Sequence, residues 1–207
     1  MNAINDVFPD SPQRFCLRHI YANFKSAGFR WEELKKHLDQ AAYSFTKSGH
    51  EKGMENLKKE SFEAWQWLSQ ISDHTWARYK MDTVCKTDLV VDNLSEVFNR
   101  MILDVRNKPI RTMLDGIRTK LMIKFQKTRE KIESCRWEIT PTYSEILEEG
   151  KKWAKNCDAY MAGPGIWQVT SSSDNTYCVN LNTYSCDCRW WDMTAVPCSH
   201  SIAAMQK

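Results

Sequence analysis

The chain of 207 residues lacks any long hydrophobic run. No stretch approaches the roughly 18 apolar residues that a membrane-spanning helix needs. The first ten residues have neither the basic region nor the apolar core of a secretory signal peptide. We therefore expect a soluble intracellular protein with no membrane partner. The length is sufficient for one or two domains with a buried core.

A disulfide framework is also absent from the sequence. Four of the eight cysteines lie in the last fifth of the chain, three of them in a close cluster, and the other four, at positions 16, 85, 135 and 157, are scattered without regular spacing. Scattered thiols are typical of a reducing compartment rather than of a secreted domain held together by disulfides.

The clustered cysteines form a C-x-C-x9-C-x-H array, made up of Cys186, Cys188, Cys198 and His200. Thiolates and imidazoles are the ligands that zinc prefers, and four protein ligands in a tetrahedron leave no open position for a catalytic water. The alternatives are buried cysteines without metal or disulfides, but cysteines one residue apart make poor disulfide partners. The array therefore predicts a structural zinc ion. We expect Cys188→Ser to unfold residues 166–207 and to leave the helical part intact.

The residues around the array predict a hairpin followed by a helix. A strand-like run from Tyr177 to Tyr184 leads into Cys186, and positions i and i+2 of an extended segment lie on one face. After Pro197, the apolar run at 202–205 indicates the first turns of a helix. The pattern C-x-C, variable spacer, C-x-H resembles that of the SWIM zinc finger, with every ligand position filled.

Positive charge is concentrated in one segment, although the net charge is only +3. From Arg100 to Arg136 there are eleven Lys or Arg against four Asp or Glu, whereas from Gly163 to the end there are two against three. A stripe at helical spacing runs through the basic segment: Met113, Ile117, Leu121, Phe125, Thr128 and Ile132. Lys120, Lys124, Lys127 and Lys131 fall on other faces. The segment is either a solvated helix face or a surface that contacts phosphates, and its charge leaves both readings open.

Most of the chain has the apolar periodicity of α-helices. Helices are expected at residues 13–27, 31–47, 54–71, 93–107 and 110–134 and from Pro141 to about Met161, with 76–80 continuing a helical hairpin. Ser48-Gly49 and Lys108-Pro109 are interpreted as breaks between consecutive helices. After Gly163-Pro164-Gly165 the pattern changes to strands at 166–170 and 177–181 around a turn at 171–175. The fold class is therefore mainly α-helical with a small C-terminal ββα zinc finger.

Three further features have both a structural and a functional reading. Cys16 and His19 share a helix face and supply half of a metal site, or are a packed thiol and a hydrogen-bonded imidazole. Glu96, between Asn93 and Asn99, is a carboxylate flanked by amides, but a glutamate in the first turn is also what the helix dipole favours. Trp190-Trp191, beside the array, belongs to a core or stacks on nucleic-acid bases.

Taken in order, these motifs resemble the Mutator-like element transposases of plants. The resemblance rests on C-x-x-H at Cys16 and His19, N-x-x-E-x-x-N at residues 93–99, a basic helix and a terminal SWIM finger. In that family an RNase H-like core, interrupted by a helical insertion, uses two aspartates and one glutamate to hold two metal ions for DNA cleavage and joining. The resemblance implies that Glu96 is this third acid and that Cys16 and His19 lie in the insertion.

The resemblance also defines the expected domains. Residues 1–90 correspond to the helical insertion, 91–162 to the last helices of the RNase H-like core with a linker helix, and 163–207 to the finger.

The chain departs from the family because only fifteen residues precede Cys16, too few to supply the two upstream aspartates. Two-metal chemistry needs several converging carboxylates, so we expect a C-terminal part of a transposase that is inactive alone, with Mg²⁺ bound only if the full core is present. The leading interpretation is a nuclear, zinc-binding module associated with DNA. The alternatives are part of an active transposase, or a domesticated transcriptional regulator or protein-interaction module whose finger binds other proteins.

Overall fold

The computed structural model describes residues 6–7, 9, 13–87, 89–90 and 93–207, and divides into two compact units. One unit comprises residues 1–91 and 146–207, and the other comprises residues 92–145. None of the helices in the described part of the chain is both long and apolar enough to cross a membrane.

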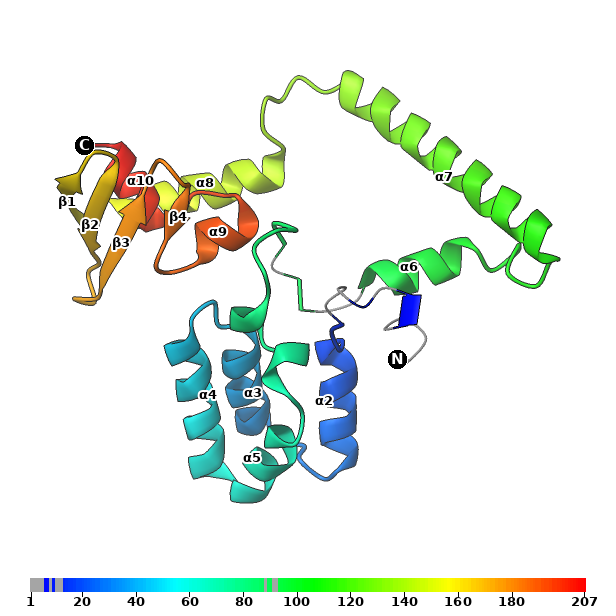
Figure 1. Cartoon of the computed structure of the whole chain (residues 1–207), viewed down its shortest axis with the longest axis horizontal. Helices are drawn as coiled ribbons and strands as arrows, with labels where there is room; N and C mark the ends of the chain where they lie inside the picture. The colour runs from blue at the N-terminus through cyan, green and yellow to red at the C-terminus, as the bar shows by residue number, and fades with distance from the viewer. Residues whose placement is uncertain (1–5, 8, 10–12, 88, 91–92) are drawn as a thin grey trace. The chain divides into compact units, whose positions relative to one another are not determined.

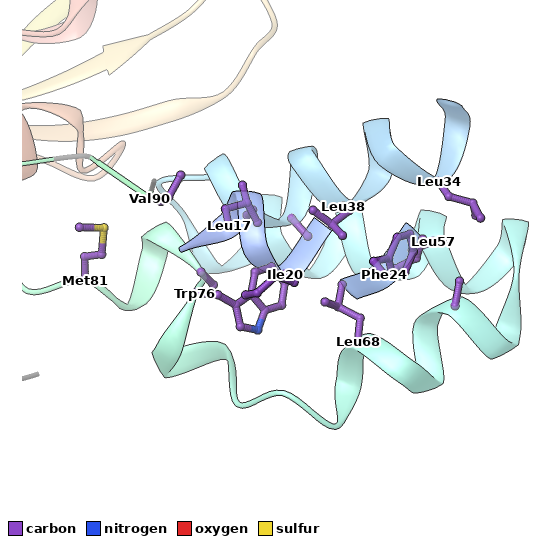
Figure 2. Packing of buried hydrophobic residues seen from close by; sticks show 14 of the residues in the cluster. Leu17, Ile20, Phe24, Leu34, Leu38, Leu57, Leu68, Trp76, Met81 and Val90 are labelled. Carbon is purple, nitrogen blue, oxygen red and sulfur yellow. The ribbon is translucent and has the colours of Figure 1, made fainter. Parts of the chain in front are cut away.

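The first described part of the chain is a bundle of the four α-helices α2 to α5 (Figure 1). They are α2 (Leu17–Ser26), α3 (Glu32–Tyr43), α4 (Lys47–Glu60) and α5 (Phe62–Ser69), followed by the 3-10 turns η1 (Asp73–Thr75) and η2 (Arg78–Lys80). The helices direct their apolar stripes inward, and Figure 2 shows how the side chains meet in one core. Its largest fully buried members are Trp76, Phe24, Leu34, Leu38, Leu57 and Leu68.

Three expectations for this bundle were wrong, two of them because side-chain caps override apolar periodicity. The single helix expected at 54–71 is two helices, since the Ser61 hydroxyl accepts the Ala64 amide at 3.1 Å and starts α5. Thr46 caps α4 in the same way, so the expected separator Ser48-Gly49 lies within its first turn. The continuation expected at 76–80 is a 3-10 turn rather than an α-helix.

The second unit contains α6 (Asn93–Met101) and α7 (Ile110–Glu133). The long helix after Pro109 was predicted within one residue of its end, whereas α6 stops six residues before the expected Asn107. Helix α7 packs closely against the connection that follows α6 where Gly116 faces Val105, and a Cβ added to Gly116 would lie 2.8 Å from the valine side chain. An ion pair of 2.9 Å between Lys120 and Asp104 adds to this contact.

The C-terminal region consists of α8 (Pro141–Ala154), four antiparallel strands and two short helices. The strands are β1 (Asp158–Gly163), β2 (Ile166–Thr170), β3 (Thr176–Asn180) and β4 (Ser185–Cys186), in the order β1-β2-β3-β4, and the helices are α9 (Trp190–Thr194) and α10 (Ser199–Met205). The strands at 166–170 and 177–181 and the turn between them are confirmed to within a residue.

The expected helix from Pro141 to about Met161 was wrong in its second half. It ends at Ala154, and Asp158–Gly163 forms a strand that pairs with β2, Tyr160 opposite Gln168. Pro164-Gly165 is consequently the turn of a β-hairpin rather than a linker, and Gly165 has a φ of +72° that favours glycine. The sheet therefore has four strands, where two were expected, and α10 packs against all four.

The strands and helices of this region enclose a second small core, which holds Val169, Val179, Trp191, Ile202, Ala203 and Ala204. Helix α8 completes it: a Cβ added to Gly150 would lie 2.9 Å from the Ile202 side chain. The expectation of a mainly helical chain with a small C-terminal β unit is confirmed. The assignment of the helices to an RNase H-like core stays a prediction.

Candidate metal centre

The four residues of the C-x-C-x9-C-x-H array meet in the structure. Cys186 ends β4, Cys188 lies in the loop that follows, Cys198 is the N-cap of α10 and His200 is in the first turn of that helix. Their donor atoms all lie within 4.8 Å of one another. A metal site needs at least three Cys, His, Asp or Glu side chains with their donor atoms close together. Among the residues that the structure describes, these four side chains are so arranged.

The spacing of the donor atoms fits a tetrahedral zinc site. With Zn–S of about 2.3 Å and Zn–N of about 2.05 Å, two ligand atoms on one ion are about 3.6 Å apart. The Nδ1 atom of His200 lies 3.7 Å from Sγ of Cys186 and 3.9 Å from Sγ of Cys198. Three sulfurs and one nitrogen select zinc over the hard cations, which prefer oxygen. The four protein ligands fill the tetrahedron, so the centre is structural.

The electrostatics of the sulfurs also favour a cation. Hydrogen bonds from the Cys186 and Cys188 thiols lower the pKa of Cys198 far below its ordinary value. Hydrogen bonding to Cys188 and Cys198, together with burial, raises the pKa of Cys186. Without a metal, one thiolate is therefore stabilised only while its neighbours stay protonated. A divalent ion removes this conflict, because it allows all three sulfurs to be thiolates at once.

Backbone hydrogen bonds hold the first pair of sulfurs in place. The Cys186 amide donates to the Asp192 carboxylate at 3.0 Å, and the Cys178 amide donates to the Asp187 carboxylate at 2.8 Å. Arg189, which adopts a left-handed conformation with φ +62°, closes the turn after the pair by donating its amide to the Cys186 carbonyl at 2.7 Å. The loop is therefore fixed on both sides of Cys188.

The second pair of ligands is oriented by α10 and by β3. Ser201, fully buried, donates its amide toward the Cys198 sulfur at 3.5 Å and its hydroxyl to the Cys198 carbonyl at 2.9 Å. The Tyr177 ring stacks on the imidazole of His200 with centroids 3.9 Å apart. Such contacts around the ligands fix their orientation and contribute to metal affinity.

Helix α9 also contacts the helical bundle within the same unit. Met193 is fully buried in the bundle core, and the Arg189 guanidinium donates to the carbonyls of Tyr79 and, at 3.1 Å, Met81. The Trp190 ring lies 5.0 Å from that of Phe45. The zinc loop therefore continues directly into a contact with the bundle.

Of the tryptophan pair beside the array, Trp191 has a structural role. Trp191 is only 4% exposed and belongs to the core of the C-terminal region, so it is not placed to stack on bases. Trp190 is half-buried against Phe45.

Sequence reasoning did not find the supporting residues Asp192, Ser201 and Tyr177. A signal was present for Asp192, because an acidic residue in the first turn of a short helix next to a metal loop can accept a nearby amide. No local signal existed for the Met193 contact, because its partners are more than a hundred residues away along the chain.

The other candidate residues lie away from the four ligands in sequence and are not part of that group. Cys16 is the N-cap of α2, and the His19 amide donates to its carbonyl at 3.0 Å, while the His19 side chain is exposed. Glu96 lies in the first turn of α6 and is also exposed. A metal at Cys16 and His19 and a catalytic role for Glu96 stay predictions.

A four-ligand centre of this kind, built on a sheet edge and a helix start, defines a small zinc-binding unit stabilised by its metal. Residues 177–207, which contain all four ligands, match the SWIM zinc finger family. Comparison with curated proteins found no match for the chain, and comparison with solved structures found none either.

Proposed function

We propose that the chain is a zinc-binding module that associates with DNA, derived from a Mutator-like transposase and not catalytic by itself. The observation that carries the zinc part is the convergence of three sulfurs and one imidazole nitrogen within 4.8 Å. DNA association is supported by the excess of eleven basic over four acidic residues from Arg100 to Arg136, which suits phosphate contacts. A nuclear location follows from a DNA partner.

The transposase derivation is supported by the order of motifs, with Cys16 and His19 first, then Glu96, a basic helix and the SWIM finger. Glu96 sits at the start of a helix, where a third acid of the two-metal site is expected by resemblance. With its two aspartates supplied by further sequence, the site would hold Mg²⁺ for phosphoryl transfer. Without them, the two-metal site lacks two of its three acids, so we propose no reaction for this chain.

A second candidate, a regulator or interaction module whose finger binds protein, is favoured by the charge of the finger itself. Residues 163–207 carry two basic against three acidic side chains, so this region offers little attraction for phosphates. In this case DNA binding without cleavage, or no DNA binding at all, would accompany an intact zinc centre.

The test is duplex DNA binding by the zinc-loaded chain across a salt series, before and after a chelator removes zinc. We expect affinity to fall steeply with salt, because phosphate contacts release counterions. Binding that weakens when zinc is removed assigns the contact to the finger or to a surface that it stabilises, and binding that persists assigns it to the basic segment. Absence of binding at low salt with zinc present would refute the DNA association and favour the second candidate.

A further inference from the structure

A cavity lies beside the zinc ligands, and its walls come from several parts of the chain. It has a volume of about 470 Å³, and Cys188, Cys198 and His200 belong to its lining. Phe45 contributes from the loop between α3 and α4, and α8 and α9 supply further side chains. All of the lining residues belong to one compact unit. A space of this size is large enough for a small ligand or for a side chain of a partner.

Helix α8 turns one face toward this cavity. Four of its residues line it: Ile146, Glu149, Gly150 and Trp153. Their i, i+3, i+4 and i+7 spacing places them on one side of the helix. Leu147 and Ala154, on the neighbouring side, pack into the core of the C-terminal region. Trp153 does not enter that core and is 59% exposed. Its indole ring therefore borders the cavity while remaining open to a ligand.

Three aromatic rings border the cavity, those of Phe45, Trp153 and Trp190. The Phe45 and Trp190 rings form a tilted corner, with centroids 5.0 Å apart and an angle of 51° between the planes. The Arg78 guanidinium, which does not line the cavity, already lies 4.5 Å from the centroid of Phe45. A cation in the cavity would therefore rely on the two indoles, and tryptophan is the aromatic residue that attracts cations most strongly.

The charges around the cavity favour a cation. Among the described residues that line it there is one carboxylate, that of Glu149, and no lysine or arginine. Zinc held by three thiolates and a neutral imidazole adds one net negative charge to the wall. An anion such as a phosphate would be repelled, and a neutral apolar group would gain nothing from the carboxylate. A cation with an apolar surface suits both the rings and the charge.

We propose that this cavity binds a trimethylammonium group, carried by a trimethyllysine side chain of a partner protein. Trp153 and Trp190 contact the methyl groups, and Glu149 supplies the opposite charge. An unmodified lysine ammonium is strongly hydrated and brings three N–H donors, which a mostly apolar lining leaves poorly satisfied. A trimethylammonium group has the same charge and no donor, and aromatic side chains recognise such groups. The cavity also has room for the aliphatic stem of the lysine, beside Ile146 and Pro197.

The test is a nuclear magnetic resonance titration of the zinc-loaded, ¹⁵N-labelled full chain with N-acetyl-trimethyllysine methylamide. We expect the indole N–H signals of Trp153 and Trp190 to shift with a Kd of about 1–10 mM or tighter, because this probe carries the recognised group without a peptide. The signal of Trp137, an exposed tryptophan outside the cavity, should stay in place. The same compound with an unmodified lysine should bind at least tenfold more weakly.

Two variants remove the proposed contacts without touching a core. Trp153→Ala should weaken binding about tenfold, because it deletes one of the two indoles, and Trp137→Ala is its matched control. Glu149→Gln should weaken binding about threefold, because an exposed charge contributes little in water. Glu148→Gln is its control, since Glu148 is an adjacent carboxylate that does not line the cavity and pairs with Lys151 at 2.7 Å. Both controls should retain the parental affinity.

Several outcomes overturn the proposal. They are absence of shifts in the two indole signals, equal binding of the trimethylated and the unmodified compound, or parental affinity in Trp153→Ala. Choline is titrated in parallel, because it carries the same trimethylammonium group on a shorter stem. Tighter binding of choline than of the lysine compound would overturn the assignment to a lysine side chain.

Discussion

The carboxylate of Asp192 offers the sharpest test of how the zinc loop is built. It accepts the amide of Cys186 at 3.0 Å, and Cys186 is only 4% exposed. Removing the carboxylate leaves this amide buried without its acceptor, which costs about 1.5–3 kcal/mol for a hydrogen bond to a charged group. Because zinc binding includes the folding of the loop, this cost should appear in the zinc affinity.

Asp192→Ala should therefore bind zinc about 10–100-fold more weakly than the parent chain, since 1.4 kcal/mol is a factor of ten. Asp192→Asn keeps an acceptor oxygen but loses the charge, so its loss should be smaller, about 5–10-fold. Competition with a chromophoric zinc chelator measures both values.

Asp174→Asn is the matched control. It removes the same charge from the turn between β2 and β3, and asparagine tolerates the positive φ of 58° found there. We expect unchanged zinc affinity. The reasoning fails if Asp192→Ala binds zinc as tightly as the parent chain, or if Asp174→Asn loses as much affinity as Asp192→Asn.

Three further predictions concern the cores and the metal. Met193→Ala should lower the free energy of unfolding by about 2–5 kcal/mol in urea titrations, because the side chain is fully buried, whereas Met205→Ala, at an exposed position, should change it little. Gly53→Ala should destabilise by about 1–3 kcal/mol, since the added Cβ would lie 2.5 Å from the Ala41 amide nitrogen; thermal unfolding measures this loss, and an unchanged midpoint would contradict the close helix approach. Zinc affinity should fall when the pH is lowered from about 8 to about 6, because protons compete for the Cys186 thiol, whose pKa is raised in the metal-free protein; a pH-independent affinity would show that the thiols are not ligands.

The sequence predicted the features that depend on near neighbours. The cluster of Cys186, Cys188, Cys198 and His200 was found because two short Cys/His motifs indicate a shared site by spacing alone, and α7 was found because a proline precedes a long uninterrupted stripe. Strand β1 was missed because its residues, Asp158–Gly163, follow a helix without an early stop signal, and only their pairing with β2 makes them extended. Strand formation of this kind is decided by partners rather than by local preference.

The structure also changes the expectation that loss of zinc leaves the helical part intact. Asp192 and Met193 are consecutive residues of α9, yet the first holds the amide of a zinc ligand and the second fills the core of the bundle. The Lys86 ammonium donates to the Asp192 carbonyl at 2.9 Å and Arg189 donates to two bundle carbonyls, so the same short segment is bound on both sides. When the metal is removed and the loop unfolds, the bundle loses Met193 as completely as if it had been truncated. We therefore expect the zinc centre to stabilise more than the small sheet that carries its ligands.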